Sequence, residues 1–186
     1  MITSAYRPAK GRFLISEPFM ADENFQRTVV LLVEHGKEGS LGFILNRRLK
    51  LRIGELIDDM EALDVPVFSG GPVEGHTLYY VHRLGHLPGS QQVHDGLYWG
   101  GDFDTLKHMA QGGQVHPDEI RFFVGYSGWA PGQLQSELKR KSWIVAPENT
   151  GFVFADDVQG IWQQMLRSLG DKYRIIANYP ADPRLN

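Results

Sequence analysis

The pattern of hydrophobic and polar positions predicts strands more often than helices. Residues 28–35 are rich in β-branched side chains and are apolar on both faces, which is typical of a strand in the middle of a sheet. Glycines at positions 36, 39 and 42 follow, and residues 41–46 are again mostly apolar. We therefore predict that these two segments pair as antiparallel neighbours.

Further elements follow from the same patterns. Residues 53–60 have helical spacing, and residues 91–99 read as a hairpin because Asp95-Gly96 is a favoured two-residue turn. A helix running to Met109 can begin at Asp102 or Asp104, since aspartate accepts hydrogen bonds from the first helical turn. We also predict strands at 65–68, 77–83, 120–126 and 143–146, helices at 131–141 and 156–169, and one helical turn at 22–27.

These elements define the expected fold class. Strands outnumber helices, neighbouring strands pair often, and a regular β–α–β alternation is absent from the pattern. This favours an α+β fold with a mixed or mostly antiparallel, strongly curved sheet over a doubly wound nucleotide-binding fold. No repeat or low-complexity linker divides the chain, so we predict one domain over residues 1–186.

Composition narrows the classes of function. The chain has no cysteine among its 186 residues, which excludes disulfides, thiolate metal sites and cysteine nucleophiles. Its formal net charge of -3 gives no general attraction to nucleic acid or anionic lipid. The first residues lack the apolar run of a signal peptide, and no stretch of about 18 apolar residues exists to cross a bilayer. We expect a cytoplasmic protein without a membrane partner.

The segment GYSGWAPGQL, residues 125–134, comes within one residue of the Gly-x-Ser-x-Gly elbow of serine hydrolases. Trp129 occupies the position where that elbow needs its second glycine, and Gly128 lies one residue too early. Pro131 also biases Ala130 away from helical angles, so a helix cannot start directly after Ser127. We predict a structural joint between a strand and a helix, with Ser127 as a hydrolase nucleophile kept as an alternative.

Residues 70–77 match the phosphate-binding loop of nucleotide-binding proteins except that His76 replaces its lysine. Pro72 removes one backbone donor, and Glu74 adds negative charge where phosphates would lie. The residues after Thr77 read as a strand, whereas the loop requires the start of a helix. A tight turn between two strands is the better interpretation.

The histidines are candidates for metal binding, and the basic residues are candidates for nucleic-acid binding. His82 and His86 are four residues apart but are separated by loop residues, and no His-Glu-x-x-His motif occurs, so we predict no metal and no cofactor. Cations at Arg47, Arg48, Lys50 and Arg52 form the one charge cluster, which can contact a phosphate backbone. Without a recognisable DNA-binding motif, we predict a solvated, charged loop there.

Several short motifs together resemble one bacterial family, the YqgE/AlgH family. They comprise residues 11–18, 25–30, 34–35, 42–46, 70–73, 125–134 and 137–138. Each motif alone is weak, but their order and spacing extend the resemblance over nearly the whole chain. The resemblance implies one α+β domain with a closed or bifurcated, barrel-like sheet surrounded by helices. It also implies a family without an established activity, some of whose members carry the label of transcriptional regulator.

The leading functional hypothesis is a cytoplasmic binding or regulatory protein without catalysis of its own, whose partner is a protein or small molecule. No complete catalytic constellation is visible, yet many motif residues lie at turns and strand ends that can border one cleft. The candidate cleft residues are His35, Asn46, Gly70, Gly71, Pro72, Tyr126, Ser127, Gly128, Trp129 and Gln133. Two alternatives are a hydrolase that uses Ser127 with His35 or His82, and a transcriptional regulator that acts directly or indirectly.

Overall fold

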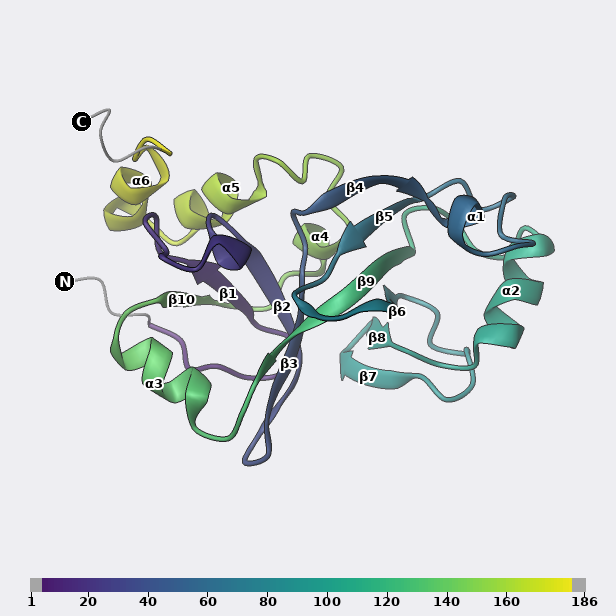
Figure 1. The fold of residues 1–186 in the computed structure, drawn as a ribbon, viewed down its shortest axis with the longest axis horizontal. Coiled ribbons are helices and arrows are strands. Elements are labelled where there is room, and N and C mark those ends of the chain that lie inside the picture. The colour runs from purple at the N-terminus through teal and green to yellow at the C-terminus, as the bar shows by residue number, and fades with distance from the viewer. Residues whose placement is uncertain (1–4, 182–186) are drawn as a thin grey trace.

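One sheet of ten strands organises residues 5–181, which the computed structural model describes (Figure 1). The strands are β1 (Phe13–Ser16), β2 (Val29–Gly36), β3 (Gly39–Ile44), β4 (Arg48–Arg52), β5 (Pro66–Ser69), β6 (Val73–His82), β7 (Gln91–His94), β8 (Leu97–Trp99), β9 (Ile120–Trp129) and β10 (Trp143–Ala146). The main strand order is β10-β1-β2-β3-β9-β6-β8-β7, and β4 with β5 lies off this path.

Strand β9 joins the two halves of the sheet. Its end pairs antiparallel with β3, where Ser127 lies opposite Gly42. Its beginning lies between β6, which is antiparallel to it, and β5, which is parallel to it. The sheet is therefore mixed and open rather than a closed barrel, and the prediction of an α+β fold with a mixed or antiparallel sheet is confirmed.

Seven helical segments surround this sheet in the described part of the chain (Figure 1). They are the 3₁₀ turn η1 (Glu23–Phe25) and the helices α1 (Ile53–Leu56), α2 (Phe103–Gln111), α3 (Gln133–Lys139), α4 (Thr150–Val153), α5 (Ile161–Ser168) and α6 (Asp171–Ala177). The turn η1 is capped by Asp22 and α2 by Asp102, whose side chains accept from Asn24 N and Thr105 N. No helix within residues 5–181 has the length and apolar character needed to cross a membrane.

Alternate residues of the strands enter different cores. In β1, Phe13 and Ile15 pack with Trp162 of α5, whereas Leu14 between them packs with Trp143 and Leu134 on the other face. Because both faces of these strands are covered, the side chains that point to either face are apolar. This explains the continuous hydrophobic character of residues 28–35 in the sequence.

The two halves of the sheet share the larger core. Phe43 of β3 stacks on Phe123 of β9 with ring centroids 4.9 Å apart, and both side chains are fully buried. A second core lies under α2, where Leu106 packs with residues such as Val67 and Phe122. Aromatic contact thus holds the halves together at the point where β9 passes from one to the other.

Several predicted elements differ from the observed ones. The helix that begins at Ile53 ends at Leu56 instead of Met60, because Ile57 is extended and Asp59 adopts a positive φ of 67°. The predicted loop of basic residues is strand β4, and β9 continues to Trp129, so α3 starts only at Gln133. The helix predicted from residue 156 starts at Ile161. Strand β1 and helices α4 and α6 were not predicted.

Candidate functional site

Ser127 lies inside strand β9, not at an elbow between a strand and a helix. Its side chain is fully buried, and its Oγ donates a hydrogen bond of 3.0 Å to the carbonyl oxygen of Gly70. The backbone N–H of Ile44 donates to the same carbonyl at 2.9 Å. Because the strand places this hydroxyl in the interior, it is closed to a substrate, and the geometry does not fit a nucleophile.

The two histidines considered as partners for Ser127 are held elsewhere. His35 Nδ1 lies 2.7 Å from Ser40 Oγ, across the β2–β3 hairpin. His82 is fully buried, and its Nδ1 accepts from the backbone N–H of Leu84 at 3.1 Å. The proton of His82 is therefore on Nε2, which donates to the Gly100 carbonyl at 2.8 Å. Burial lowers the pKa of both imidazoles below the ordinary value.

Asn46 bridges two backbone segments. Its Oδ1 accepts from the N–H of Val29 at 3.0 Å, and its Nδ2 donates to the carbonyl of Arg27 at 2.8 Å. Both ends of the amide are thus used to hold the start of β2 against the end of β3. We assign Asn46 a structural role rather than a place in a cleft.

The Gly70-Gly71-Pro72 segment packs on β9 through its backbone. A Cβ on Gly70 would overlap the Gly125 carbonyl, and one on Gly71 would overlap the Tyr126 carbonyl. The two glycines therefore permit close approach of main chain to main chain. Thr77 lies within β6, so the expected turn into a strand is observed in place of the helix start that a phosphate-binding loop requires.

A carboxylate holds the end of β9 against β10. Glu137 Oε2 accepts hydrogen bonds from Trp129 Nε1 at 2.9 Å and from Trp143 Nε1 at 2.8 Å. Gln133 Nε2 donates to Glu137 Oε1 at 3.0 Å, and its own Oε1 accepts from Ala130 N at 2.9 Å. Gln133 and Trp129 therefore have a structural role, because with Glu137 they fix α3 on the sheet.

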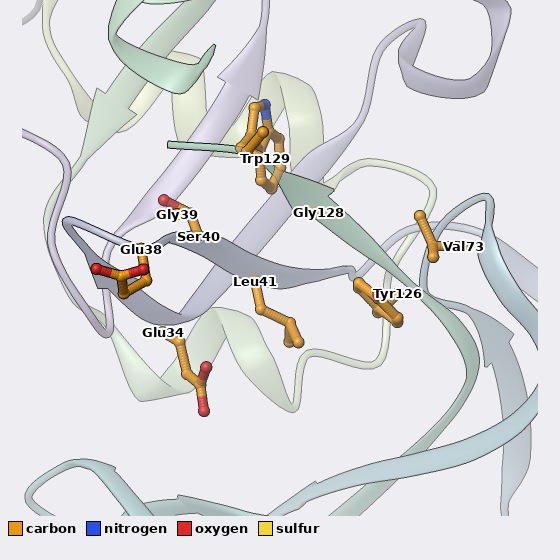
Figure 2. A pocket seen from close by; sticks show the side chains of 10 residues that line it. Glu34, Glu38, Gly39, Ser40, Leu41, Val73, Tyr126, Gly128 and Trp129 are labelled. Carbon is orange, nitrogen blue, oxygen red and sulfur yellow. The ribbon is translucent and has the colours of Figure 1, made fainter. Parts of the chain in front are cut away.

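A shallow depression of about 440 Å³, here called the hairpin groove, lies beside Trp129 (Figure 2). Of the ten candidate cleft residues, Tyr126, Gly128 and Trp129 line it. Glu34, Leu41 and Gly128 lie directly opposite one another on β2, β3 and β9 and so form one row across the sheet. The residues that line the hairpin groove are Glu34, Glu38, Gly39, Ser40, Leu41, Val73, Tyr126, Gly128, Trp129 and Ala130.

The acidic and aliphatic members of the hairpin groove were not among the predicted site residues. Figure 2 shows Glu34, Glu38 and Leu41 on the β2–β3 hairpin and Val73 at the far end beside Tyr126. The exposed Glu34 ends a run of buried apolar residues in β2. This change from apolar to charged residues is visible in the sequence. Glu38 and Val73 carry no such signal, because only the folded sheet brings them to the groove.

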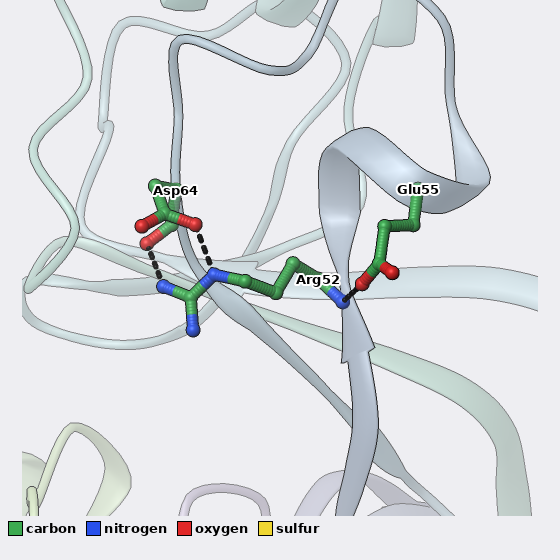
Figure 3. Close-up of polar contacts among 3 residues, drawn as sticks. All are labelled: Arg52, Glu55 and Asp64. Atoms are coloured by element: carbon green, nitrogen blue, oxygen red, sulfur yellow. Dashed lines mark hydrogen bonds and ion pairs between the residues drawn. The ribbon is translucent and has the colours of Figure 1, made fainter.

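The basic cluster is partly neutralised by the fold. Arg52 forms an ion pair with Asp64, and its backbone N–H donates to the Glu55 carboxylate at 2.7 Å (Figure 3). Arg47 donates to the carbonyl oxygens of Glu23 and Gln26. Arg48 and Lys50 are exposed on β4. Two of the four cations are thus committed to contacts within the chain, which leaves a small basic surface.

No group of three or more histidine, aspartate or glutamate side chains within residues 5–181 is arranged to hold a metal ion. Among the titratable groups near the candidate site, Tyr79 has a local partner. Tyr79, which packs edge-on against Tyr126 with ring centroids 5.7 Å apart, donates to the Glu74 carboxylate. Burial first, and then this contact, raise the pKa of Tyr79 to about 12.

Comparison with known proteins identifies the family. A family model described as AlgH-like matches residues 13–174, and the chain belongs to that family. The UPF0301 protein of Cytophaga hutchinsonii is 44% identical over 179 residues, which cover 95% of this chain and 98% of that protein. The UPF0301 protein BF2109 of Bacteroides fragilis is 42% identical over 180 residues, which cover 96% of this chain and 92% of that protein.

Solved structures share the fold. A protein from Corynebacterium diphtheriae aligns with a TM-score of 0.81 at 22% identity, covering 96% of this chain and 95% of that one. The AlgH protein from Pseudomonas aeruginosa aligns with a TM-score of 0.74 at 26% identity, covering 97% of this chain and 98% of that one. The family resemblance read from the motifs is confirmed, and none of these names states an activity or a ligand.

Proposed function

We propose that this member of the AlgH-like family is a non-catalytic binding protein whose hairpin groove holds a basic, partly apolar segment of a protein partner. The observation that carries this proposal is the row formed by Glu34, Leu41 and Gly128 across three strands. It presents a carboxylate, an aliphatic side chain and a bare stretch of backbone on one open face of the sheet.

Charge and shape support this choice of partner. Glu34 and Glu38 are both exposed at one end of the hairpin groove, while Val73 is 37% exposed at the other. Carboxylates at the rim attract basic side chains, and the half-buried Leu41 and Tyr126 offer apolar contact between the two ends. At Gly128 a Cβ would come within 3.0 Å of the Tyr126 ring, so a side chain there would crowd the floor of the groove.

The side chains of the neighbouring motif favour binding over catalysis. Ser127 is buried on the Gly70 carbonyl, and Glu137 is occupied by two indole N–H groups. The Ser127 hydroxyl and the Glu137 carboxylate are therefore already engaged in structural hydrogen bonds. A regulatory role would follow from binding a protein, and the contacts of Arg47 and Arg52 leave little basic surface to support direct DNA binding.

The test uses labelled octapeptides of alternating lysine and leucine, and of alternating glutamate and leucine, in fluorescence anisotropy titrations. We expect saturable binding of the basic peptide that weakens with added salt, and no binding of the acidic one. Amide chemical shifts should move at Ser40, Leu41 and Gly128. Equal binding of both peptides, or shifts confined to another face, would sink the proposal.

The double variant Glu34→Gln/Glu38→Gln should weaken binding of the basic peptide roughly fivefold or more, about 1 kcal/mol, because it removes two surface charges. The matched control is Asp58→Asn/Glu61→Gln, which removes two exposed carboxylates near α1, outside the hairpin groove. The control should retain the affinity of the original chain. Equal losses in both double variants would show that only net charge matters.

A further inference from the structure

A second cavity, here called the arginine pocket, lies between β4, β5, the start of β9 and the loop after α4. Its volume is about 230 Å³, and Arg48, Phe68, Arg121 and Phe154 are among its lining residues. Arg121 Nη2 donates to the carbonyl of Ala155 at 2.9 Å. Its Nη1 is buried and has no hydrogen-bond acceptor among the described residues. A buried guanidinium N–H without an acceptor is rare and calls for a physical explanation.

The position of Arg121 is held by its surroundings. Its Cζ lies 4.7 Å from the centroid of the Phe68 ring, so the guanidinium rests on an aromatic face. Burial lowers the pKa of Arg121 to about 10, the nearby Asp156 opposes this change, and Arg48 adds to it. The cation is therefore costly to keep in place, and an anionic acceptor in the pocket would offset that cost.

The charges around the arginine pocket are balanced. Two cations, Arg48 and Arg121, line it together with three carboxylates. One of these, Asp64, is already paired with Arg52, and the other two are the exposed Asp118 and Asp156. Two cations and two anions of the pocket thus remain available to contact a ligand, namely Arg48, Arg121, Asp118 and Asp156. Such a pocket disfavours a bare phosphate and matches a molecule that carries one charge of each sign.

We propose that the arginine pocket binds a small zwitterion of the α-amino acid class, with its carboxylate near the guanidinium groups of Arg48 and Arg121 and its ammonium group toward Asp118 and Asp156. An apolar side chain of the ligand would contact Phe68 and Phe154, which line the same cavity. The volume suits a single amino acid rather than a nucleotide. This site is separate from the hairpin groove, and neither proposal depends on the other.

The first test is isothermal titration of the full chain with L-leucine and L-phenylalanine at millimolar concentrations. We expect saturable binding of at least one of them. Isopentylamine and 4-methylpentanoate, which are leucine without its carboxylate and without its ammonium group, should bind at least tenfold more weakly. Inorganic phosphate should not compete. Absence of saturable binding of both amino acids, or competition by phosphate as effective as that of 4-methylpentanoate or more, would overturn the proposal.

Variants then locate the binding. Arg48→Ala changes an exposed side chain on β4, so we expect it to fold and to weaken binding about tenfold. Lys50→Ala is the matched control, because Lys50 is exposed on the same strand but does not line the pocket. Arg121→Met keeps the length of the side chain and should abolish binding, with folding checked by circular dichroism. If Lys50→Ala and Arg48→Ala weaken binding equally, the assignment to this pocket is wrong.

Discussion

The hydroxyl of Ser127 donates a hydrogen bond to the carbonyl oxygen of Gly70, 3.0 Å away and 57 residues earlier in the chain. This contact ties the end of β9 to the turn between β5 and β6. The two glycines of that turn lie against the backbone of residues 125–127, so no side chain separates the segments. The serine that resembles a nucleophile in the sequence is therefore part of the joint between the two halves of the sheet.

Replacing Ser127 by alanine should lower the free energy of unfolding by about 1 kcal/mol, the usual net value of one hydrogen bond. The loss is moderate because the Gly70 carbonyl keeps the N–H of Ile44 as a donor. Urea denaturation followed by circular dichroism measures it. A fluorophosphonate probe should label neither the variant nor the original chain, and labelling that depends on Ser127 would restore the hydrolase hypothesis.

Replacing Glu137 by glutamine should lower the free energy of unfolding by about 1–3 kcal/mol, because an amide cannot accept from both indoles and from Gln133 at once. If the amide oxygen takes the place of Oε2, its NH2 group faces the Gln133 Nε2 donor. If it takes the place of Oε1, both Trp129 and Trp143 lose their buried acceptor. The measurement is urea denaturation read by tryptophan fluorescence. Gln135→Ala, at an exposed position of the same helix, should change stability by less than about 0.5 kcal/mol.

The hairpin of β2 and β3 could be predicted because the residues that determine it are close together in the sequence. Apolar residues on both faces and glycines at the turn decide both strands and their pairing. The same reasoning failed at β4, whose alternating arginine, lysine and leucine residues read as a charged loop. This strand owes its conformation to pairing with β5, in which Arg48 lies opposite Phe68. The alternation of charged residues with leucine over residues 48–52 is itself a period-2 strand signal, which the interpretation as a charged loop overlooked.

The candidate cleft was only partly predictable, because contacts between distant segments decide which motif residues are covered. Turn residues such as Gly70 and Gly71 were expected to border a cavity, but they fill the joint on β9. Trp129 was also expected to border that cavity, yet its ring is buried and its N–H is bound to Glu137. Sequence position does not tell whether a motif residue faces solvent or packs against a distant segment.

Arg27→Lys should loosen the C-terminal helix. Arg27 Nη2 donates to the carbonyls of Tyr179 and Pro180, each at 2.6 Å, and its Cζ lies 4.6 Å from the Trp162 ring centroid. Lysine lacks the planar group that makes these contacts together. We expect a loss of about 1–2 kcal/mol and faster amide hydrogen exchange in α6. Arg174→Lys, on the exposed side of α6, should leave that exchange unchanged.

His82 makes stability depend on pH in a defined direction. Its Nδ1 accepts from Leu84 N–H, and this contact requires the neutral ring, whereas its Nε2–H can donate to Gly100 in either protonation state. Burial lowers the pKa of His82 in the folded state, whereas the unfolded chain has the ordinary value of about 6.5. As the pH falls, the unfolded chain therefore binds the proton first. The contribution of His82 is complete above about pH 6.5 and is lost as the pH falls through the lowered pKa.

The variant His82→Asn keeps an acceptor for the Leu84 N–H but cannot be protonated in this range. We expect it to be less stable than the original chain at pH 8, by about 1–3 kcal/mol, because it fills less of the core. Between pH 7 and pH 5, its stability should fall less steeply, since His35 would then be the remaining histidine with a lowered pKa. Urea denaturation at half-unit pH steps gives both slopes. His116→Gln, at an exposed position, is the control and should retain the original slope. If the slope of His82→Asn equals that of the control, His82 is not the group whose protonation destabilises the fold.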